Sequence, residues 1–170
     1  ELAIHAFCLL PDGLHILATP LGDPGNLSRF MKALSCSASS RRKRLHGATS
    51  VWEVRYRSSP VEPGQWMLAC ICYIERLPVT QRLASSAYHY HRSSYRMRLG
   101  KTHQYWLEDP EEYTRLGGSI EDRAEAYRMY MSNGLDPHEE KMIDTAVKRC
   151  RLTGSRHFVR EVYRKYGVLG

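Results

Sequence analysis

The stretch Leu10-Pro11-Asp12-Gly13-Leu14-His15-Ile16-Leu17 joins two apolar segments through a short polar turn. Residues 2–10 before the turn and residues 14–19 after it are apolar and have the length of strands. Proline presets one turn dihedral and glycine accepts a positive φ. Pro11-Asp12-Gly13 therefore predicts a β-hairpin with Gly13 in the left-handed conformation.

Downstream of this hairpin the sequence predicts mixed structure and then helices only. The segments are a helix from the cap Asn26 to Leu34, an exposed Ser-rich and basic loop over 35–47, a strand over 50–57, a buried apolar helix over 63–77 that Pro78 ends, and helices over 109–116, 120–132, 137–151 and 155–166, the last two a helix-turn-helix-like pair. This order indicates an α+β core over residues 1–97 and a helical C-terminal extension over 98–170. Because the chain opens inside a predicted strand, we expect one N-terminal strand of the core to be missing.

Composition narrows the class of protein. The 170 residues fit one domain, and their apolar content is ordinary for a globular protein. The net charge of +7 favours polyanionic partners, of which nucleic acid is the commonest. Five scattered cysteines form no paired zinc-ligand pattern and indicate reduced, cytoplasmic thiols. No apolar run reaches the length of a membrane span, so we expect no membrane partner.

Two residues could carry chemistry, although each has an ordinary structural explanation. Tyr73 lies in the apolar helix among Trp66, Ala69 and Cys70, where an aromatic residue usually belongs to the core. His15 lies on an apolar strand, where a histidine is more often a hydrogen-bonded core residue than a ligand. Neither residue marks a site by itself.

Several motifs in a fixed order give these residues a context. They are Leu10-Pro11-Asp12-Gly13-Leu14-His15 with Thr19-Pro20, Gly47 followed by Val51-Trp52-Glu53-Val54-Arg55-Tyr56-Arg57, Tyr73-Ile74-Glu75-Arg76-Leu77-Pro78-Val79, Tyr90-His91-Arg92-Ser93-Ser94-Tyr95, and Gly154-Ser155-Arg156-His157-Phe158-Val159. Together they resemble the REP-associated tyrosine transposases, small single-tyrosine enzymes with a His-hydrophobe-His motif. The resemblance spans nearly the whole chain.

The resemblance implies a fold and a reaction. The fold would be a ferredoxin-like antiparallel sheet backed by helices. Tyr73 would attack a phosphodiester of single-stranded DNA, leaving a phosphotyrosine and a free 3′ hydroxyl. The family's Mg²⁺ or Mn²⁺ is held by two histidines on one strand face and a third ligand four residues after the tyrosine. His15 matches the second histidine.

The chain departs from this ligand set at two of three positions. Gly13 replaces the first histidine, and Leu77 occupies the place of the third ligand. One imidazole is a poor magnesium site, and on an ideal strand Asp12 faces away from His15. We therefore expect a transposase relative that binds single-stranded or hairpin DNA and whose strand cleavage has decayed.

Two alternatives stay open, and with them the question of whether the chain is an enzyme. One is an active single-strand nuclease that recruits its metal through substituted ligands or backbone oxygens. The other is a non-catalytic regulatory binder of DNA or RNA in which Tyr73 serves only the core. The cofactor is accordingly Mg²⁺ or Mn²⁺, as in the family, or none.

Nucleic-acid contacts are expected from cationic and aromatic side chains. The candidates are Arg41, Arg42, Lys43 and Arg44 in the predicted loop, Trp52, Arg55 and Arg57 on the predicted strand, and Arg156, Arg160 and Arg164 as a stripe on the last helix. The resemblance further implies a bacterial, cytoplasmic, nucleoid-associated protein that acts in DNA transposition as a monomer or a homodimer.

Overall fold

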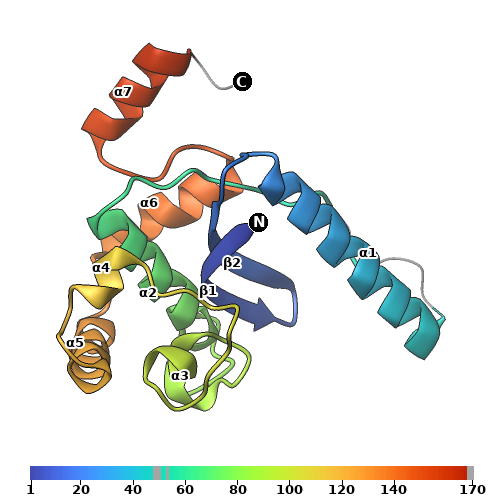
Figure 1. The fold of residues 1–170 in the computed structure, drawn as a ribbon, viewed down its shortest axis with the longest axis horizontal. Helices are drawn as coiled ribbons and strands as arrows, with labels where there is room; N and C mark the ends of the chain where they lie inside the picture. Colours follow the sequence, from blue (N-terminus) through green and yellow to red (C-terminus); the bar gives the residue numbers. More distant parts are fainter. Residues whose placement is uncertain (48–50, 53, 168–170) are drawn as a thin grey trace.

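The computed structural model describes residues 1–47, 51–52 and 54–167. Its elements are β1 (Leu2–Leu10), β2 (Gly13–Pro20), α1 (Asn26–His46), α2 (Gln65–Thr80), the 3-10 helix η1 (Ala87–His89), α3 (Tyr95–Arg98), α4 (Glu111–Thr114), α5 (Ile120–Asn133), α6 (Pro137–Lys148) and α7 (Arg156–Tyr166). Figure 1 shows the β-hairpin at the centre, α2 and α4–α6 on one side of it, and α1 and α7 extending outward. The predicted α+β class, with an antiparallel sheet backed by helices and a helical C-terminal part, is confirmed.

The hairpin forms where the sequence predicts it. β1 and β2 pair antiparallel from Leu2↔Pro20 to Leu10↔Gly13, with an irregularity between Ile4 and Ala6. These two strands make up the sheet in the described residues, whereas a complete ferredoxin-like sheet has four.

Helix α2 provides the centre of the hydrophobic core. Its sequence is apolar almost all round, and its residues from Ala69 to Glu75 are all buried. It packs on the hairpin, and one core cluster joins Cys8 of β1 and Ile71 of α2 with Tyr127 of α5 and Ile143 of α6. The predicted C-terminal extension thus shares its apolar core with the predicted catalytic core, and the domain boundary after residue 97 stays a prediction.

The loop predicted over residues 35–47 is wrong. α1 runs without interruption to His46, and Gly47 (φ 68°) ends it by donating its N–H to the carbonyl of Lys43 at 2.9 Å. No proline or glycine interrupts residues 26–46, arginine and lysine are good helix formers, and cations are favoured near a helix C-terminus. The basic residues are therefore held on a helix.

Pro78 does not end α2, contrary to the prediction. A proline removes one backbone donor but has a helical φ, and α2 continues to Thr80, with Gln81 N donating to Leu77 O at 2.8 Å. The added turn brings Thr80 and Gln81 to the pocket described below.

A buried polar network fixes the helices on the sheet. Glu75 and Arg98 are both buried, and Arg98 Nε lies 3.1 Å from Glu75 Oε1. The Glu75 carboxylate also accepts hydrogen bonds from Ser94 Oγ (2.6 Å) and Tyr127 Oη (2.7 Å), and Arg98 Nη1 donates to Asp109 at 3.0 Å. The Tyr-Ile-Glu and Ser-Ser motifs thus meet in this network.

The strand predicted over residues 50–57 is not formed by its described members; residues 50 and 53 lie outside the described residues. The alternating apolar residues of this segment do not form one buried face, because Val54 is 73% exposed. The segment that follows pairs with the α6–α7 connection instead: Val61 bridges Thr153, and Glu62 N donates to Thr153 O at 2.8 Å. The Glu62 carboxylate accepts from Ser155 N and Oγ at 2.5 and 3.1 Å, which anchors the start of α7.

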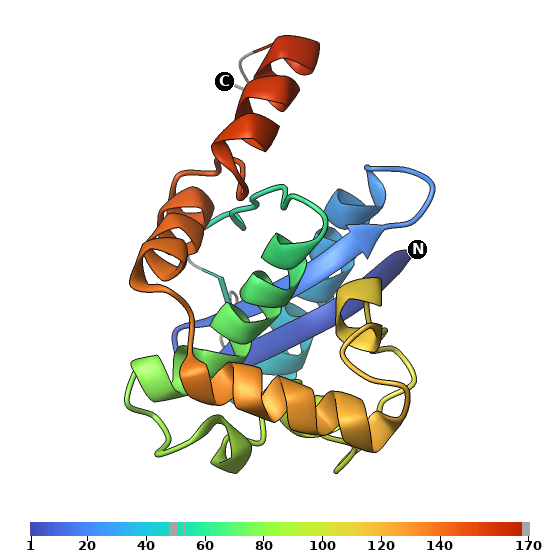
Figure 2. The ribbon, with the colours of Figure 1, turned by 90° about the vertical axis from the view of Figure 1, so that its left-hand side faces the viewer.

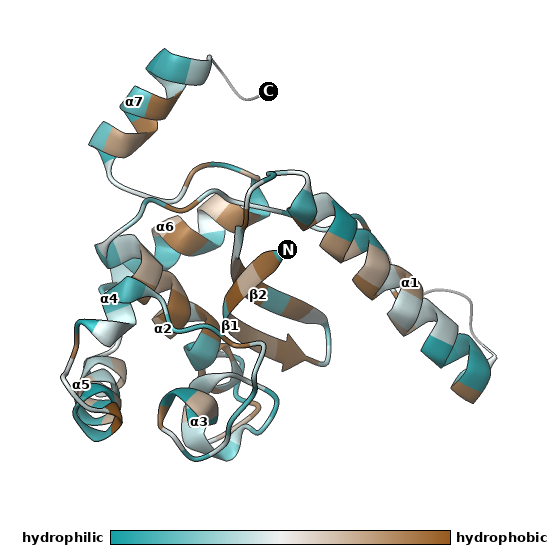
Figure 3. Cartoon of the chain, viewed as in Figure 1, coloured by the Kyte–Doolittle hydropathy of each residue, from teal (hydrophilic) through white to brown (hydrophobic). Residues whose placement is uncertain are grey.

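Beyond this anchor α7 extends from the body of the molecule, as both ribbon views show (Figures 1 and 2). Figure 3 shows hydrophobic and hydrophilic residues alternating along it, and none of its side chains is fully buried. No helix in the described residues is long and apolar enough to cross a membrane.

Candidate functional site

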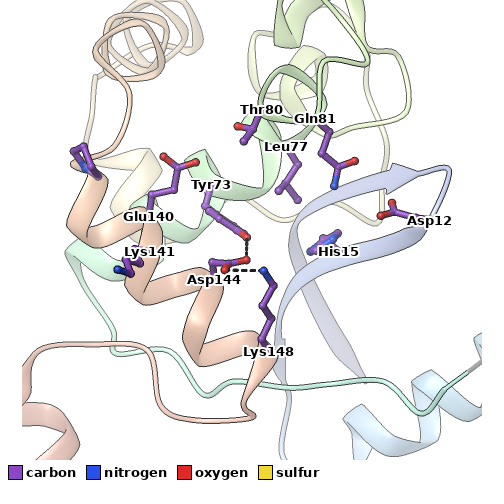
Figure 4. Close-up of a pocket in the computed structure, with 11 residues that line it drawn as sticks. Asp12, His15, Tyr73, Leu77, Thr80, Gln81, Glu140, Lys141, Asp144 and Lys148 are labelled. Carbon is purple, nitrogen blue, oxygen red and sulfur yellow. Dashed lines mark hydrogen bonds and ion pairs between the residues drawn. The ribbon is translucent and has the colours of Figure 1, made fainter.

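Tyr73 reaches a pocket of about 630 Å³ between α2, the hairpin and α6. Its ring belongs to the hydrophobic core, and the residue is only 9% exposed. Its hydroxyl, however, faces the pocket (Figure 4). The two interpretations of this residue, core aromatic and site residue, are therefore both compatible with its position.

His15 faces the same pocket from β2. It pairs with Cys8 across the hairpin and lies half-buried on the face that carries the buried Leu17. Burial lowers the pKa of His15, while the charges of Asp12 and Asp144 oppose that shift. The imidazole is thus neutral at pH 7, the form that binds metals and accepts hydrogen bonds.

The third wall of the pocket comes from α6, which the sequence did not associate with Tyr73. Tyr73 Oη donates to Asp144 Oδ1 at 3.2 Å, and Lys148 Nζ lies 2.9 Å from Asp144 Oδ2 (Figure 4). Burial raises the pKa of Tyr73, and the negative charge and hydrogen-bond acceptance of Asp144 raise it further. The phenol is accordingly protonated at neutral pH.

The remaining polar lining completes a site of mixed charge. It consists of Asp12, Thr80, Gln81, Glu140 and Lys141, beside the apolar Leu77 and Pro137. Asp12 lines the pocket together with His15, so the expectation that it faces away is wrong. It lies in the turn, where strand alternation does not apply.

These residues do not fit the family's divalent ion. Leu77 brings only a hydrocarbon side chain to the pocket, and Gly13 brings none. Among the described residues, no group of three or more His, Cys, Asp and Glu side chains could hold a metal ion. A Mg²⁺ site with its octahedral oxygen ligands is therefore not built here.

Gly13 is not required by the turn, contrary to the prediction. The φ angle of Gly13 is not positive, and the residue begins β2 as the partner of Leu10. A Cβ added at Gly13 would meet no atom within 4 Å. The turn and its surroundings thus do not require glycine at this position.

The arrangement can donate and accept protons and can offer positive charge to an anion. Tyr73 supplies a hydroxyl next to a carboxylate acceptor, Asp144. Lys148 is exposed, and its ammonium group pairs with Oδ2 of the same carboxylate. A phosphate entering the pocket would find Lys148 and Lys141 as cations, but also three carboxylates that oppose it.

The expected nucleic-acid contacts fall on separate surfaces. Arg41, Arg42, Lys43 and Arg44 are all exposed at the end of α1, a helix with six Lys and Arg and no Asp or Glu. Arg55 and Arg57 are exposed on the segment that returns beside α1, where Tyr56 Oη lies 3.0 Å from Ser28 Oγ. Trp52 is half-buried and less open to a base than predicted.

The stripe on α7 is present but is far from α1 in Figure 1. Arg156, Arg160 and Arg164 are all exposed, and Arg164 forms an ion pair with Glu161 at 2.8 Å. The structure thus brings His15 and Tyr73 together and leaves the cations of α1 and α7 as two surfaces.

Sequence reasoning missed Asp144 and Lys148. They lie 71 and 75 residues after Tyr73, in an ordinary amphipathic helix without a motif, so only the packing of α6 reveals them. Comparison of the chain with protein-family models, curated proteins and solved structures finds no match.

Proposed function

We propose that this protein binds single-stranded or hairpin DNA, as a relative of the REP-associated tyrosine transposases that no longer cleaves DNA by their metal-dependent route. The observation that carries the proposal is the meeting of His15 and Tyr73 in one pocket. The resemblance rests on motifs that follow one another in the sequence, and such motifs need not bring the side chains of His15 and Tyr73 together in space. Their common pocket is therefore support beyond the motifs.

Charge supports the choice of DNA as the partner. The net charge is +7, and α1 presents its cations without a neighbouring acid on the same helix. Such a surface contacts phosphates without reading base sequence.

The same pocket argues against metal-dependent cleavage. His15 is the single ligand left of the family's three, and the phenol of Tyr73 is held in its protonated, weakly nucleophilic form. We assign no step to a metal ion.

A second candidate, metal-independent cleavage, is favoured by the hydrogen bond from Tyr73 to Asp144. In that reaction the bond from Tyr73 Oη to phosphorus forms and the phosphorus–O3′ bond breaks. The phenolic proton passes to Asp144, and the leaving 3′ oxygen takes a proton from the Lys148 ammonium group. An aspartate is, however, a weak base for a phenol of raised pKa.

The experiment combines a binding titration with a test for the covalent adduct. Three fluorescent DNAs of one composition are compared: a hairpin with a single-stranded 5′ extension, the unpaired strand, and a plain duplex. We expect tighter binding of the first two, and no protein–DNA adduct on denaturing gels with Mn²⁺, Mg²⁺ or chelator.

Each outcome has a distinct meaning. Equal affinity for the plain duplex contradicts the proposed substrate. An adduct that Tyr73→Phe abolishes contradicts the loss of cleavage. If that adduct forms in chelator and disappears in Asp144→Asn, the metal-independent route is supported.

A further inference from the structure

We infer that an aromatic edge beside β1, formed by Phe7, Tyr88, Tyr105 and Trp106, stacks the unpaired bases of single-stranded DNA. The inference rests on the proposed function, because it takes DNA as the partner, and it assigns the part of the surface that reads the single strand. None of these four residues lines the pocket of Tyr73.

The edge is built on the side of β1 that does not pair with β2. Two loops attach there through the backbone: Ser94 N donates to Phe7 O at 3.0 Å, Leu9 N donates to Arg92 O at 2.8 Å, and Glu108 N donates to Ile4 O at 2.8 Å. Two loops that are far apart in sequence, one after Tyr88 and one carrying Tyr105 and Trp106, are thus both attached along β1.

Three aromatic side chains on or next to these loops are exposed. Tyr105 is 96% exposed, Trp106 47% and Tyr88 39%, although each of these residues has a large ring that water solvates poorly. The rings of Phe7 and Trp106 lie 5.3 Å apart and are tilted, so Trp106 is supported from beneath by β1. Exposed rings on a fixed support provide flat surfaces on which bases can stack.

Charge around the edge selects an anionic partner. Residues 82–107 contain no Asp or Glu and five Lys or Arg, of which Arg98 is buried in its pair with Glu75, and one exposed acid, Glu108, follows directly. Of the five cations, Arg92 and Lys101 are exposed, and Arg96 stacks on Tyr88 at 5.1 Å from the ring centroid. An aromatic row with interspersed cations is the pattern of proteins that bind single strands, since cations contact phosphates while rings contact bases.

The decisive variant is Tyr105→Ala. The Tyr105 ring lies 5.0 Å from the ring of His103 and is almost fully exposed, so its removal should leave the fold intact. We expect affinity for an unstructured oligonucleotide to fall about fivefold or more, since one base–aromatic stack is removed. Tyr166→Ala, at an exposed tyrosine on α7, is the matched control and should change affinity little.

An oligonucleotide that keeps the phosphates and lacks the bases shows how much of the affinity depends on base stacking. The wild-type protein should bind an abasic oligonucleotide of equal length more weakly than the normal one. For Tyr105→Ala that difference should shrink. Binding of the normal strand should also quench the fluorescence of Trp106, and Trp106→Phe should remove the quench while retaining binding.

The outcomes separate this inference from the proposed function. If the protein binds DNA but Tyr105→Ala and the abasic probe change nothing, the edge does not stack bases and the proposed function stands. If the wild-type protein binds no DNA, both fail. If sedimentation shows a wild-type dimer that Tyr105→Ala dissociates, the edge is an interface between copies and the inference is overturned.

Discussion

Tyr73 on α2 donates a hydrogen bond to Asp144 on α6, with 3.2 Å between the phenolic oxygen and Oδ1. The hydrogen bond joins a residue of the predicted catalytic core to the predicted helical extension. It places a carboxylate against the hydroxyl that would act as nucleophile, and it explains part of the raised pKa of Tyr73. The extension is therefore part of the candidate site.

The first prediction follows from this pair. Asp144→Ala removes a negative charge and an acceptor, so the pKa of Tyr73 should fall, although burial, the largest cause of the shift, remains. Alkaline titration of tyrosine absorbance should show one tyrosine ionising at lower pH than in the wild type. Adding Tyr73→Phe should remove that change, and Glu121→Gln on α5, outside the pocket, is the control. An unchanged titration would mean that the hydrogen bond does not control this phenol.

The second prediction concerns stability at alkaline pH. Burial raises the pKa of three thiols and several phenols, to about 12 for Cys8, Cys70, Cys72, Tyr113 and Tyr130. The unfolded chain loses these protons at lower pH than the folded protein, so unfolding becomes easier as pH rises. The free energy of unfolding should decline from about pH 9 to pH 12, given the ordinary pKa values of free Cys and Tyr. Urea titrations at several pH values measure this, and a flat profile would contradict the burial of these groups.

The third prediction tests the buried ion pair. Arg98→Met leaves Glu75 as a buried charge without its cation, which should reduce the free energy of unfolding by about 3–5 kcal/mol. Arg164→Met breaks the exposed pair with Glu161 and should cost at most about 1 kcal/mol. Equal effects in urea unfolding would show that the Glu75–Arg98 pair is solvated.

The fourth prediction concerns the two positions at which the chain departs from the ligand set of the transposases that it resembles. A Cβ at Gly13 meets no atom within 4 Å, and Gly13→His with Leu77→Asn should create Mn²⁺ binding at His15, measured by calorimetry. Leu77 is buried, so its change should cost about 2–4 kcal/mol and thermal unfolding must be checked first.

Matched variants make this test decisive. His15→Ala in the double variant should remove the metal, and any adduct that forms on DNA should disappear in Tyr73→Phe. Failure of the folded double variant to bind Mn²⁺ would show that these positions do not share one site.

The fifth prediction concerns the cations of α1. Changing Arg41, Arg42, Lys43 and Arg44 to Gln should weaken DNA binding for every sequence and flatten its dependence on salt. The log–log slope should change by about 0.7 for each phosphate of a single strand that the variant no longer neutralises. The matched triple change of Arg156, Arg160 and Arg164 to Gln shows whether α7 contributes as well. A wild-type slope in the α1 variant would mean that this surface does not bind DNA.

Local sequence patterns were sufficient to predict much of the fold. The apolar segments around Pro11-Asp12 determined the hairpin, because strands and turns depend on near neighbours in sequence. The same holds for α2 and for the C-terminal helices, whose periodicity and caps such as Ser119 and Asp136 are local signals. Two of the wrong predictions, the loop over residues 35–47 and the helix end at Pro78, concern local structure as well, because neither sequence excludes a helix.

The candidate site shows what sequence alone determined and what required the tertiary structure. The sequence alone indicated His15, Tyr73 and positions 13 and 77 as the ones to inspect, since these lie in motifs with fixed spacing. Only the packed structure placed Asp144 and Lys148 beside Tyr73 and gathered distant aromatic residues along β1. Contacts across 70 or more residues depend on how helices pack on the sheet, and that packing is decided by the whole core rather than by any one segment.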